Sequence, residues 1–183
     1  MKLVLDACVL YPTVMREVLL GAAAAGFYQP LWSDRILEEW ARAAARNDPL
    51  HEAQARGEIA MLSARWPRAK IAVAEAQTAR FWLPDPADVH VLAAGVFGHA
   101  DGIVTMNAKD FPRHILAEEG LTRADPDTLL LGFFEARPDA MRAAAETVLT
   151  EARRLSDGDW TMRALMKKAR LPRLGKALER PGS

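Results

Sequence analysis

The chain has 183 residues, of which 50% are hydrophobic, and its 24 basic and 24 acidic side chains give a formal net charge of zero. This length and composition are those of a folded protein with one sizeable core, or with one domain and a small appendage, and they exclude a mostly disordered chain. The single cysteine, Cys8, excludes an intrachain disulfide and a zinc site built from several cysteines.

The N-terminal region argues against a secreted or membrane-bound protein. Residues 18–27 are the longest run of small and apolar residues, and this run is too short to span a bilayer. Asp6 interrupts the first apolar stretch, where a secretory signal would stay uncharged. We therefore expect a cytoplasmic protein that makes no contact with a membrane.

Strands and helices alternate along the first part of the chain. The hydrophobic pattern predicts strands at residues 2–6, 28–33, 70–74 and 102–106, and helices at residues 14–25, 34–47, 48–65, 86–98, 112–119 and 125–137. Ser33 is a suitable N-cap for the second helix, and Pro86 suits the first position of the fourth, where a missing N–H loses no hydrogen bond. This alternation predicts an α/β fold in which helices cover a parallel sheet.

The end of the chain is predicted to be a helical and basic extension. Helices are expected at residues 139–155 and 160–169, with a linker at residues 156–159, so the chain divides into residues 1–136 and 137–183. Seven basic side chains and one acidic side chain, Glu179, follow Asp159. Such a stretch either contacts nucleic acid or an acidic partner, or forms a solvated helix. The candidate RNA-binding residues are Arg163, Lys167, Lys168, Arg170 and Arg173.

Acidic residues stand where strands end and helices begin. Asp6 ends the first strand, and the carboxyl ends of parallel strands form the edge at which ligands bind. At about 100° per residue, Glu39 lies at the border of its helix's apolar stripe, whereas Glu38 faces solvent and can pair with Arg42. The same geometry points Asp88 inward.

Carboxylates gathered from distant parts of a chain repel one another unless a divalent cation neutralises them. Oxygen ligands suit magnesium or manganese, and such a metal can activate water for attack on a phosphodiester. Simpler interpretations remain open at each position. Asp85 and Asp110 can cap helices, Asp88 can favour a helix dipole, and Thr105 and Asn107 can cap the end of a strand.

Four segments in this order, "LVLDACVL", "SDRILEEW", "DPADVHVLAAG" and "IVTMNAKDF", resemble the PIN-domain family, and especially its VapC-type toxin ribonucleases. The resemblance covers about residues 1–136. It implies a PIN-like parallel sheet flanked by helices, three or four carboxylates that bind Mg²⁺ or Mn²⁺, and cleavage of RNA. Matched by position, the first three acids are Asp6, Glu39 and Asp88, and Asp6 and Asp88 are the expected metal ligands.

The chain departs from the family's pattern at two positions. Asn107 stands where the fourth acid is common, so either Asp110 takes the carboxylate role or Asn107 binds through a metal-bound water; Thr105 and Asn107 are expected to support the site. Cys8 stands where many members have Asn or Ser, so a polar contact near the first aspartate is expected to be missing.

The resemblance also implies an antitoxin partner that covers the crevice, and a homodimer. The alternative of a different class is a non-catalytic PIN-fold protein that binds RNA or a protein partner, motivated by Asn107. A phosphatase that forms an aspartyl-phosphate is disfavoured by Cys8, which replaces its usual second aspartate, and a receiver domain is disfavoured by the order of the acids. No Gly-rich phosphate loop or G-x-G-x-x-G turn is present.

Overall fold

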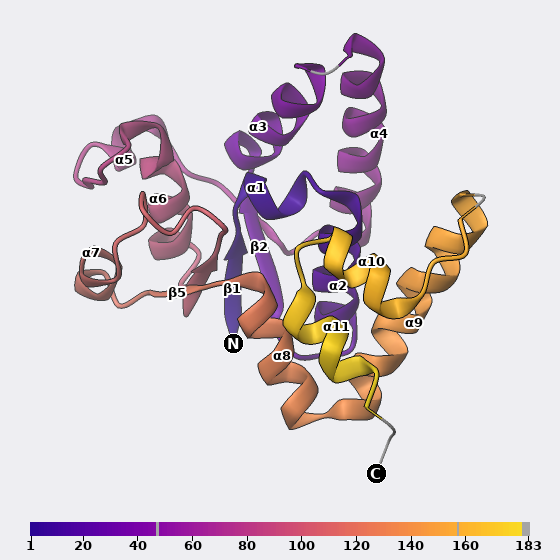
Figure 1. Cartoon of the computed structure of the whole chain (residues 1–183). Coiled ribbons are helices and arrows are strands. Elements are labelled where there is room, and N and C mark those ends of the chain that lie inside the picture. Colours follow the sequence, from indigo (N-terminus) through magenta and orange to yellow (C-terminus); the bar gives the residue numbers. More distant parts are fainter. Residues whose placement is uncertain (47, 157, 181–183) are drawn as a thin grey trace. The chain divides into compact units, whose positions relative to one another are not determined.

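The computed structural model describes residues 1–46, 48–156 and 158–180. The chain forms two compact units that are interleaved along the sequence. The first unit contains Met1–Tyr11 and Gln29–Ala124, and the second contains Pro12–Tyr28 and the chain from Asp125 onward. Figure 1 follows the chain through both units from indigo to yellow.

A parallel sheet of five strands is the centre of the first unit. Its order is β3-β2-β1-β4-β5, with β1 at Lys2–Leu5, β2 at Gln29–Ser33, β3 at Lys70–Ile71, β4 at Gly102–Val104 and β5 at Thr122–Ala124. All four pairings are parallel. The predicted α/β fold with a parallel sheet flanked by helices is therefore confirmed.

The predicted helices of this unit are present with shorter limits, and two short helices, α1 (Ala7–Leu10) and α5 (Glu75–Thr78), were not predicted. The others are α3 (Asp34–Ala45), α4 (Pro49–Arg65), the 3₁₀ turn η1 (Pro86–Asp88), α6 (Val89–Phe97) and α7 (Arg113–Glu118). Ser33 caps α3 as predicted, since its hydroxyl accepts the N–H of Ile36 at 3.3 Å. The predicted end of this helix at Asn47 lies outside the described residues.

The core of the first unit joins the sheet to α6 and α3. Leu5, Val104 and Ile103 of the central strands are completely buried, as is Ile36 of α3. Gly95 lies so close to the strand that follows α7 that an added Cβ would stand 2.8 Å from a methyl carbon of Leu121. This contact packs the last turn of α6 closely against the residue that precedes β5.

Within residues 12–28, 125–156 and 158–180, the second unit contains five helices: α2 (Thr13–Ala24), α8 (Pro126–Ala136), α9 (Pro138–Leu155), α10 (Met162–Lys168) and α11 (Pro172–Leu178). Gly26, with φ of +79°, follows the C-cap residue of α2, where the chain leaves the helix. Phe27 and Tyr28 stack on Phe133 of α8 with centroid distances of 4.8 and 5.8 Å. The buried Asp127 accepts the backbone N–H groups of Arg173 and Leu174 at 2.9 Å each, which ties the start of α11 to α8.

The two units do not divide at residue 136, because α2 and α8 pack with the C-terminal helices. The division predicted from the sequence is one of proposed function, into a domain of residues 1–136 and a basic extension of residues 137–183. The packing of the helices does not test that division, which stays a prediction. The predicted linker at residues 156–159 includes Asp157, which lies outside the described residues. In the part of the chain that the structure describes, no helix combines the length and hydrophobicity needed to cross a bilayer.

Candidate metal centre

Asp6 and Thr105 lie side by side because they follow two paired strands. Leu5 of β1 is in register with Val104 of β4, and the N–H of Asp6 donates to the carbonyl of Val104 at 3.1 Å. The Thr105 hydroxyl donates to Oδ2 of Asp6 at 2.7 Å, and both side chains are buried. The predicted supporting role of Thr105 thus has a definite contact, which orients the Asp6 carboxylate.

Asp85 and Asp88 come from the start of the next helix along the chain. The Asp85 carboxylate accepts the N–H of Ala87 at 2.9 Å, so it is the cap that the sequence predicts. Asp88 ends the 3₁₀ turn η1 and is only partly exposed. The 3₁₀ turn before α6 replaces the single helix predicted from Pro86, and it places both aspartates on the approach to the sheet edge.

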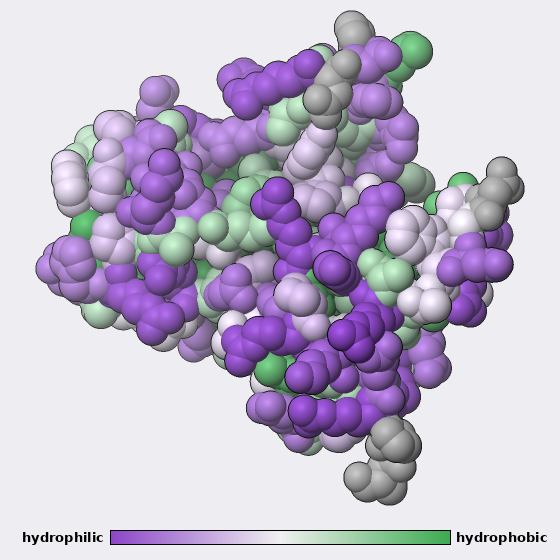
Figure 2. Space-filling view, in the orientation of Figure 1, coloured by the Kyte–Doolittle hydropathy of each residue, from purple (hydrophilic) through white to green (hydrophobic). Residues whose placement is uncertain are grey.

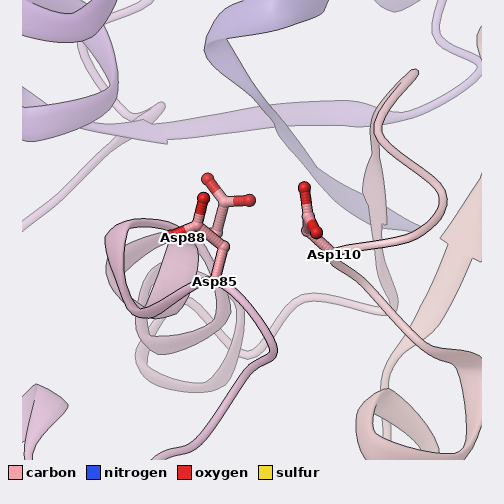
Figure 3. A group of neighbouring side chains, drawn as sticks. All are labelled: Asp85, Asp88 and Asp110. Carbon is pink, nitrogen blue, oxygen red and sulfur yellow. The ribbon is translucent and has the colours of Figure 1, made fainter.

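Asp110 reaches the same place from the loop after β4. Carboxylate oxygens of Asp85, Asp88 and Asp110 all lie within 4.8 Å of one another, which is the spacing of ligands around one cation. Figure 3 shows Asp85 and Asp88 at the start of the helix, with Asp110 facing them from the loop. The loop itself is held from β5, where the Arg123 guanidinium donates to the carbonyls of Ala108 and Phe111.

The electrostatics of Asp88 link this group to the other predicted acids. Burial, followed in order of importance by the negative charges of Asp6, Asp85, Asp110 and Glu39, raises the pKa of Asp88 to about 6. A carboxyl group in this setting is unfavourable when ionised and unaccompanied. The residues therefore fit a divalent cation, which would relieve the repulsion and for which an all-oxygen set is the preferred kind of site.

Glu39 contributes to this field from α3. Its carboxylate lies between His90, whose Nε2 is 2.7 Å from Oε1, and Arg35, whose Nε is 3.8 Å from the same oxygen. The His90 ring N–H does not point at that oxygen, so neither nitrogen of this buried ring has a hydrogen bond within the described residues. Glu38 pairs instead with Arg42 at 3.1 Å and with Arg56 at 2.9 Å, as a residue on the solvent side does.

Cys8 retains the polar contact that the sequence predicts to be missing. Its Sγ lies 3.1 Å from Oδ2 of Asp6 and accepts the N–H of Met106 at 3.3 Å. Burial, and next the charge of Asp6, raise the pKa of the thiol to about 12. A neutral thiol can donate a hydrogen bond where an amide or hydroxyl would. The expectation that Cys8 leaves the first aspartate without a polar contact is therefore wrong.

Asn107 occupies the position of the expected fourth acid and contacts Asp88 directly. Its Nδ2 donates to Oδ2 of Asp88 at 3.2 Å, and its backbone N–H donates to the Thr105 hydroxyl at 3.0 Å. The structure thus brings Asp110 into the group of three carboxylates and gives Asn107 an orienting contact. Asp6 and Glu39 are not members of that close group, although their charges act on Asp88.

Two contributors were not assigned to the site from the sequence. Asp85 was predicted mainly as a cap, because the capping pattern before Pro86 gives no information about its second oxygen. His90 was not assigned to the site from the sequence, and the sign of its contact with Glu39 was a polar ring in the otherwise apolar segment "VHVLAAG". Its partner, Glu39, lies 51 positions earlier in the sequence, a separation that helical periodicity does not cover.

A parallel sheet with carboxylates converging outside its central strands defines an α/β protein with an acidic, metal-competent edge. A family model described as PIN domain matches residues 2–109. The chain belongs to the PIN-domain family, whose members are generally metal-dependent nucleases. Comparison with curated proteins and with solved structures found no match.

Proposed function

We propose that this protein is an endoribonuclease that requires Mg²⁺ or Mn²⁺, and that it is the toxin of a type II toxin–antitoxin pair of the VapC type. The observation that carries the nuclease assignment is Asp88, a half-buried carboxyl in a PIN domain whose pKa is raised to about 6 by burial and by four neighbouring acids. Burial and the neighbouring negative charges destabilise the ionised form of this carboxyl, and a bound cation would stabilise it.

The proposed roles follow from the position of each carboxylate. Asp6 and Asp88 hold the metal, Asp110 supplies the further carboxylate in place of Asn107, and Glu39 orients the attacking water from α3. Thr105 and Asn107 keep Asp6 and Asp88 in position through the hydrogen bonds described above. When bound, the cation would lower the pKa of a coordinated water and offset the charge that develops on the phosphate.

We propose that the basic stretch of the second unit binds RNA through its phosphates. The side chains of Lys167 and Arg170 have no hydrogen bond or ion pair within the described residues, whereas Arg163 pairs with Glu179 at 2.9 Å and Arg173 donates to Thr128 at 2.9 Å. Lys168 lies over the Trp160 ring at 4.8 Å. Figure 2 shows hydrophilic side chains gathered over α10 and α11, which supports a solvent-facing basic surface.

The remaining assignments rest on the family. A toxin of this type acts in the cytoplasm, and its antitoxin is expected to cover the acidic edge and to place a basic side chain among the carboxylates. A homodimer is expected on the same ground. Co-expression with the product of an adjacent open reading frame, followed by measurement of complex formation and loss of cleavage, tests the toxin assignment separately from nuclease activity.

The nuclease assignment is tested with a pair of aspartates three residues apart. Asp88→Asn keeps the side-chain size and can still accept from Asn107, but it removes a proposed ligand charge, so cleavage of RNA with Mg²⁺ or Mn²⁺ should fall by about a hundredfold or more. Asp85→Asn keeps the cap, because Asn caps a helix about as well as Asp, and should lose much less. Full activity of Asp88→Asn would contradict the proposal.

The same RNA-cleavage assay distinguishes a nuclease from the non-catalytic alternative. Asn107 removes one charge from the position of the fourth acid and donates to Asp88, which is the observation that favours a non-catalytic PIN-fold protein that binds RNA or a protein. Metal-dependent cleavage that a chelator abolishes and that Asp88→Asn lacks excludes this alternative. RNA binding without cleavage by the folded wild-type protein, with either metal, would establish it.

A further inference from the structure

A cavity of about 430 Å³ lies in the first unit at the amino end of the sheet. Its wall includes Lys2 and Gln29, which begin β1 and β2, and the segment at residues 65–69 that leads into β3. Because all strands are parallel, this edge is opposite to the one that carries Asp6 and Thr105. The cavity is therefore separate from the candidate metal centre, and the proposed nuclease chemistry makes no use of it.

The rim of the cavity is positively charged. Lys2, Arg65 and Arg68 contribute to its wall, and no acidic side chain of the described residues does. None of these three cations has an ion pair within the described chain, in contrast to Lys70 nearby, which pairs with Asp34 at 2.8 Å. Asp101, whose carboxylate accepts the backbone N–H of Lys2, stands beside the wall without lining it. The rim thus favours an anion.

Apolar side chains and one aromatic ring also line the cavity. Leu31 and Ala69 are buried wall residues, and Trp66 is half-buried at the end of α4. The indole Nε1 is shielded from water and has no hydrogen-bond partner in the described chain. An unpaired buried donor is uncommon, and here it means that no hydrogen bond holds the indole in its present orientation. The Arg65 guanidinium lies 5.9 Å from the centroid of the same ring, so an aromatic face and a positive charge stand together in the wall.

We propose that this cavity binds a nucleotide, with the base against Trp66 and the phosphate among Lys2, Arg65 and Arg68. The volume is in the range of small-molecule sites, which is roughly 300 to 1,000 Å³. Aromatic stacking suits any base because each base has a π face, and arginine guanidinium groups match the oxygens of a phosphate. The nucleotide is either free or part of an RNA strand, since both present the same chemistry.

The proposal is tested by calorimetric titration of the full chain with adenosine 5′-monophosphate in EDTA, which excludes binding through a metal. Arg68→Gln is expected to weaken binding by about two- to tenfold, because one exposed charge-assisted contact is lost. Arg46→Gln, which neutralises an exposed arginine outside the cavity, is the matched control and should leave the affinity unchanged.

A second pair of variants examines the aromatic wall. Trp66→Leu should weaken binding by at least about fivefold, the effect of losing one stacked base, whereas Trp82→Leu removes an exposed indole elsewhere in the same unit and should have no effect. Circular dichroism confirms that each variant folds. If Trp66→Leu does not fold, the comparison of Arg68→Gln with Arg46→Gln decides alone.

A non-cleavable 2′-O-methyl RNA distinguishes the two sources of the nucleotide. Weaker RNA binding in the cavity variants assigns the site to a strand, and weaker mononucleotide binding with unchanged RNA binding assigns it to a free nucleotide; both support the proposal. Asp88→Asn should bind the mononucleotide as the wild type does, so failure of the nuclease proposal leaves this result unaffected. Affinities for both ligands that are absent, or equal in all cavity and control variants, would overturn it.

Discussion

Replacing Asp88 with asparagine is expected to stabilise the metal-free protein at pH 7 and to weaken its response to Mg²⁺. The pKa of Asp88 is raised from 3.8 to about 6 by burial and by the charges of Asp6, Asp85, Asp110 and Glu39. At pH 7 the folded protein must keep this carboxyl ionised in a place that opposes ionisation. Asparagine removes that requirement and keeps an oxygen that can accept from Asn107.

The size of the effect follows from the pKa difference. A shift of about 2 units at about 1.4 kcal/mol per unit sets an upper limit of about 3 kcal/mol, and solvent screening of this partly exposed group reduces it to about 1 to 2 kcal/mol. Between pH 4 and pH 6 the folded state binds more protons than the unfolded state, so wild-type stability falls as the pH rises through this window. Above pH 6 the whole penalty is present.

The assay is urea denaturation in EDTA at several pH values, followed by the same titration with excess Mg²⁺. The free energy of unfolding of the wild type should increase with Mg²⁺ according to the affinity for the metal. That of Asp88→Asn should be higher than the wild-type value in EDTA and should increase much less with Mg²⁺. Asp159→Asn, which removes an exposed charge outside the acidic cluster, should follow wild type in both media. A variant that is no more stable than wild type at pH 7 without metal, or that keeps the full gain with Mg²⁺, would refute the reasoning.

Four further outcomes are expected. Glu39→Gln should lower metal-dependent RNA cleavage at least tenfold, and Glu38→Gln should leave it within about twofold, because only the first charge acts on the acidic site; equal rates would contradict this assignment. Lys167→Gln should weaken RNA binding at low salt and reduce the slope of log affinity against log salt by about 0.7 to 0.9; an unchanged slope would mean that this lysine is only solvated. Asp127→Ala leaves two backbone N–H groups without an acceptor and should lower the free energy of unfolding by about 2 to 3 kcal/mol in urea denaturation. Iodoacetamide at pH 8 should alkylate Cys8 far more slowly in the native than in the unfolded protein, since burial raises the pKa of the thiol to about 12; equal rates would place the thiol at the surface.

The central strands and the α3 cap were predictable because the relevant signals are local. The short apolar run that ends at Asp6 has the length and composition of a buried strand, and Ser33 precedes an amphipathic segment with the pattern of a helix start. Glu38 and Glu39 were separated by helical geometry alone, and their contacts agree with that separation. In each case the residues that decide the outcome lie within one or two turns of one another.

The elements that were missed depend on distant partners. β5 has the sequence "TRA", which contains no apolar alternation, and it is a strand because Thr122, Arg123 and Ala124 pair with β4. α11 was missed because "PRLGKAL" contains a glycine. Gly175 permits close packing on α10, where an added Cβ would lie 2.9 Å from the Cβ of Met166. Neither contact can be deduced from local propensity.

The same limit applies to the predicted strand at residues 70–74, of which only Lys70–Ile71 pair with β2. Residues 72–74 instead lead into α5, and the N–H of its N-cap residue, Ala74, donates to the side chain of Gln77 at 2.8 Å. A short apolar run predicts that a strand is present more reliably than it predicts the length of that strand. The length depends on how many residues pair with the neighbouring strand.

Neutral hydrogen-bond donors orient three of the carboxylates at the acidic edge. Asp6 accepts from the hydroxyl of Thr105, Asp85 from a backbone N–H, and Asp88 from the amide of Asn107. No lysine or arginine of the described chain forms an ion pair with Asp6, Asp85, Asp88 or Asp110. Neutral donors fix the direction of a carboxylate and leave its charge in place, whereas an arginine would fix the direction and cancel the charge. The described residues thus keep the repulsion that raises the pKa of Asp88. The proposed cation would relieve this repulsion, and its binding would then stabilise this edge of the sheet.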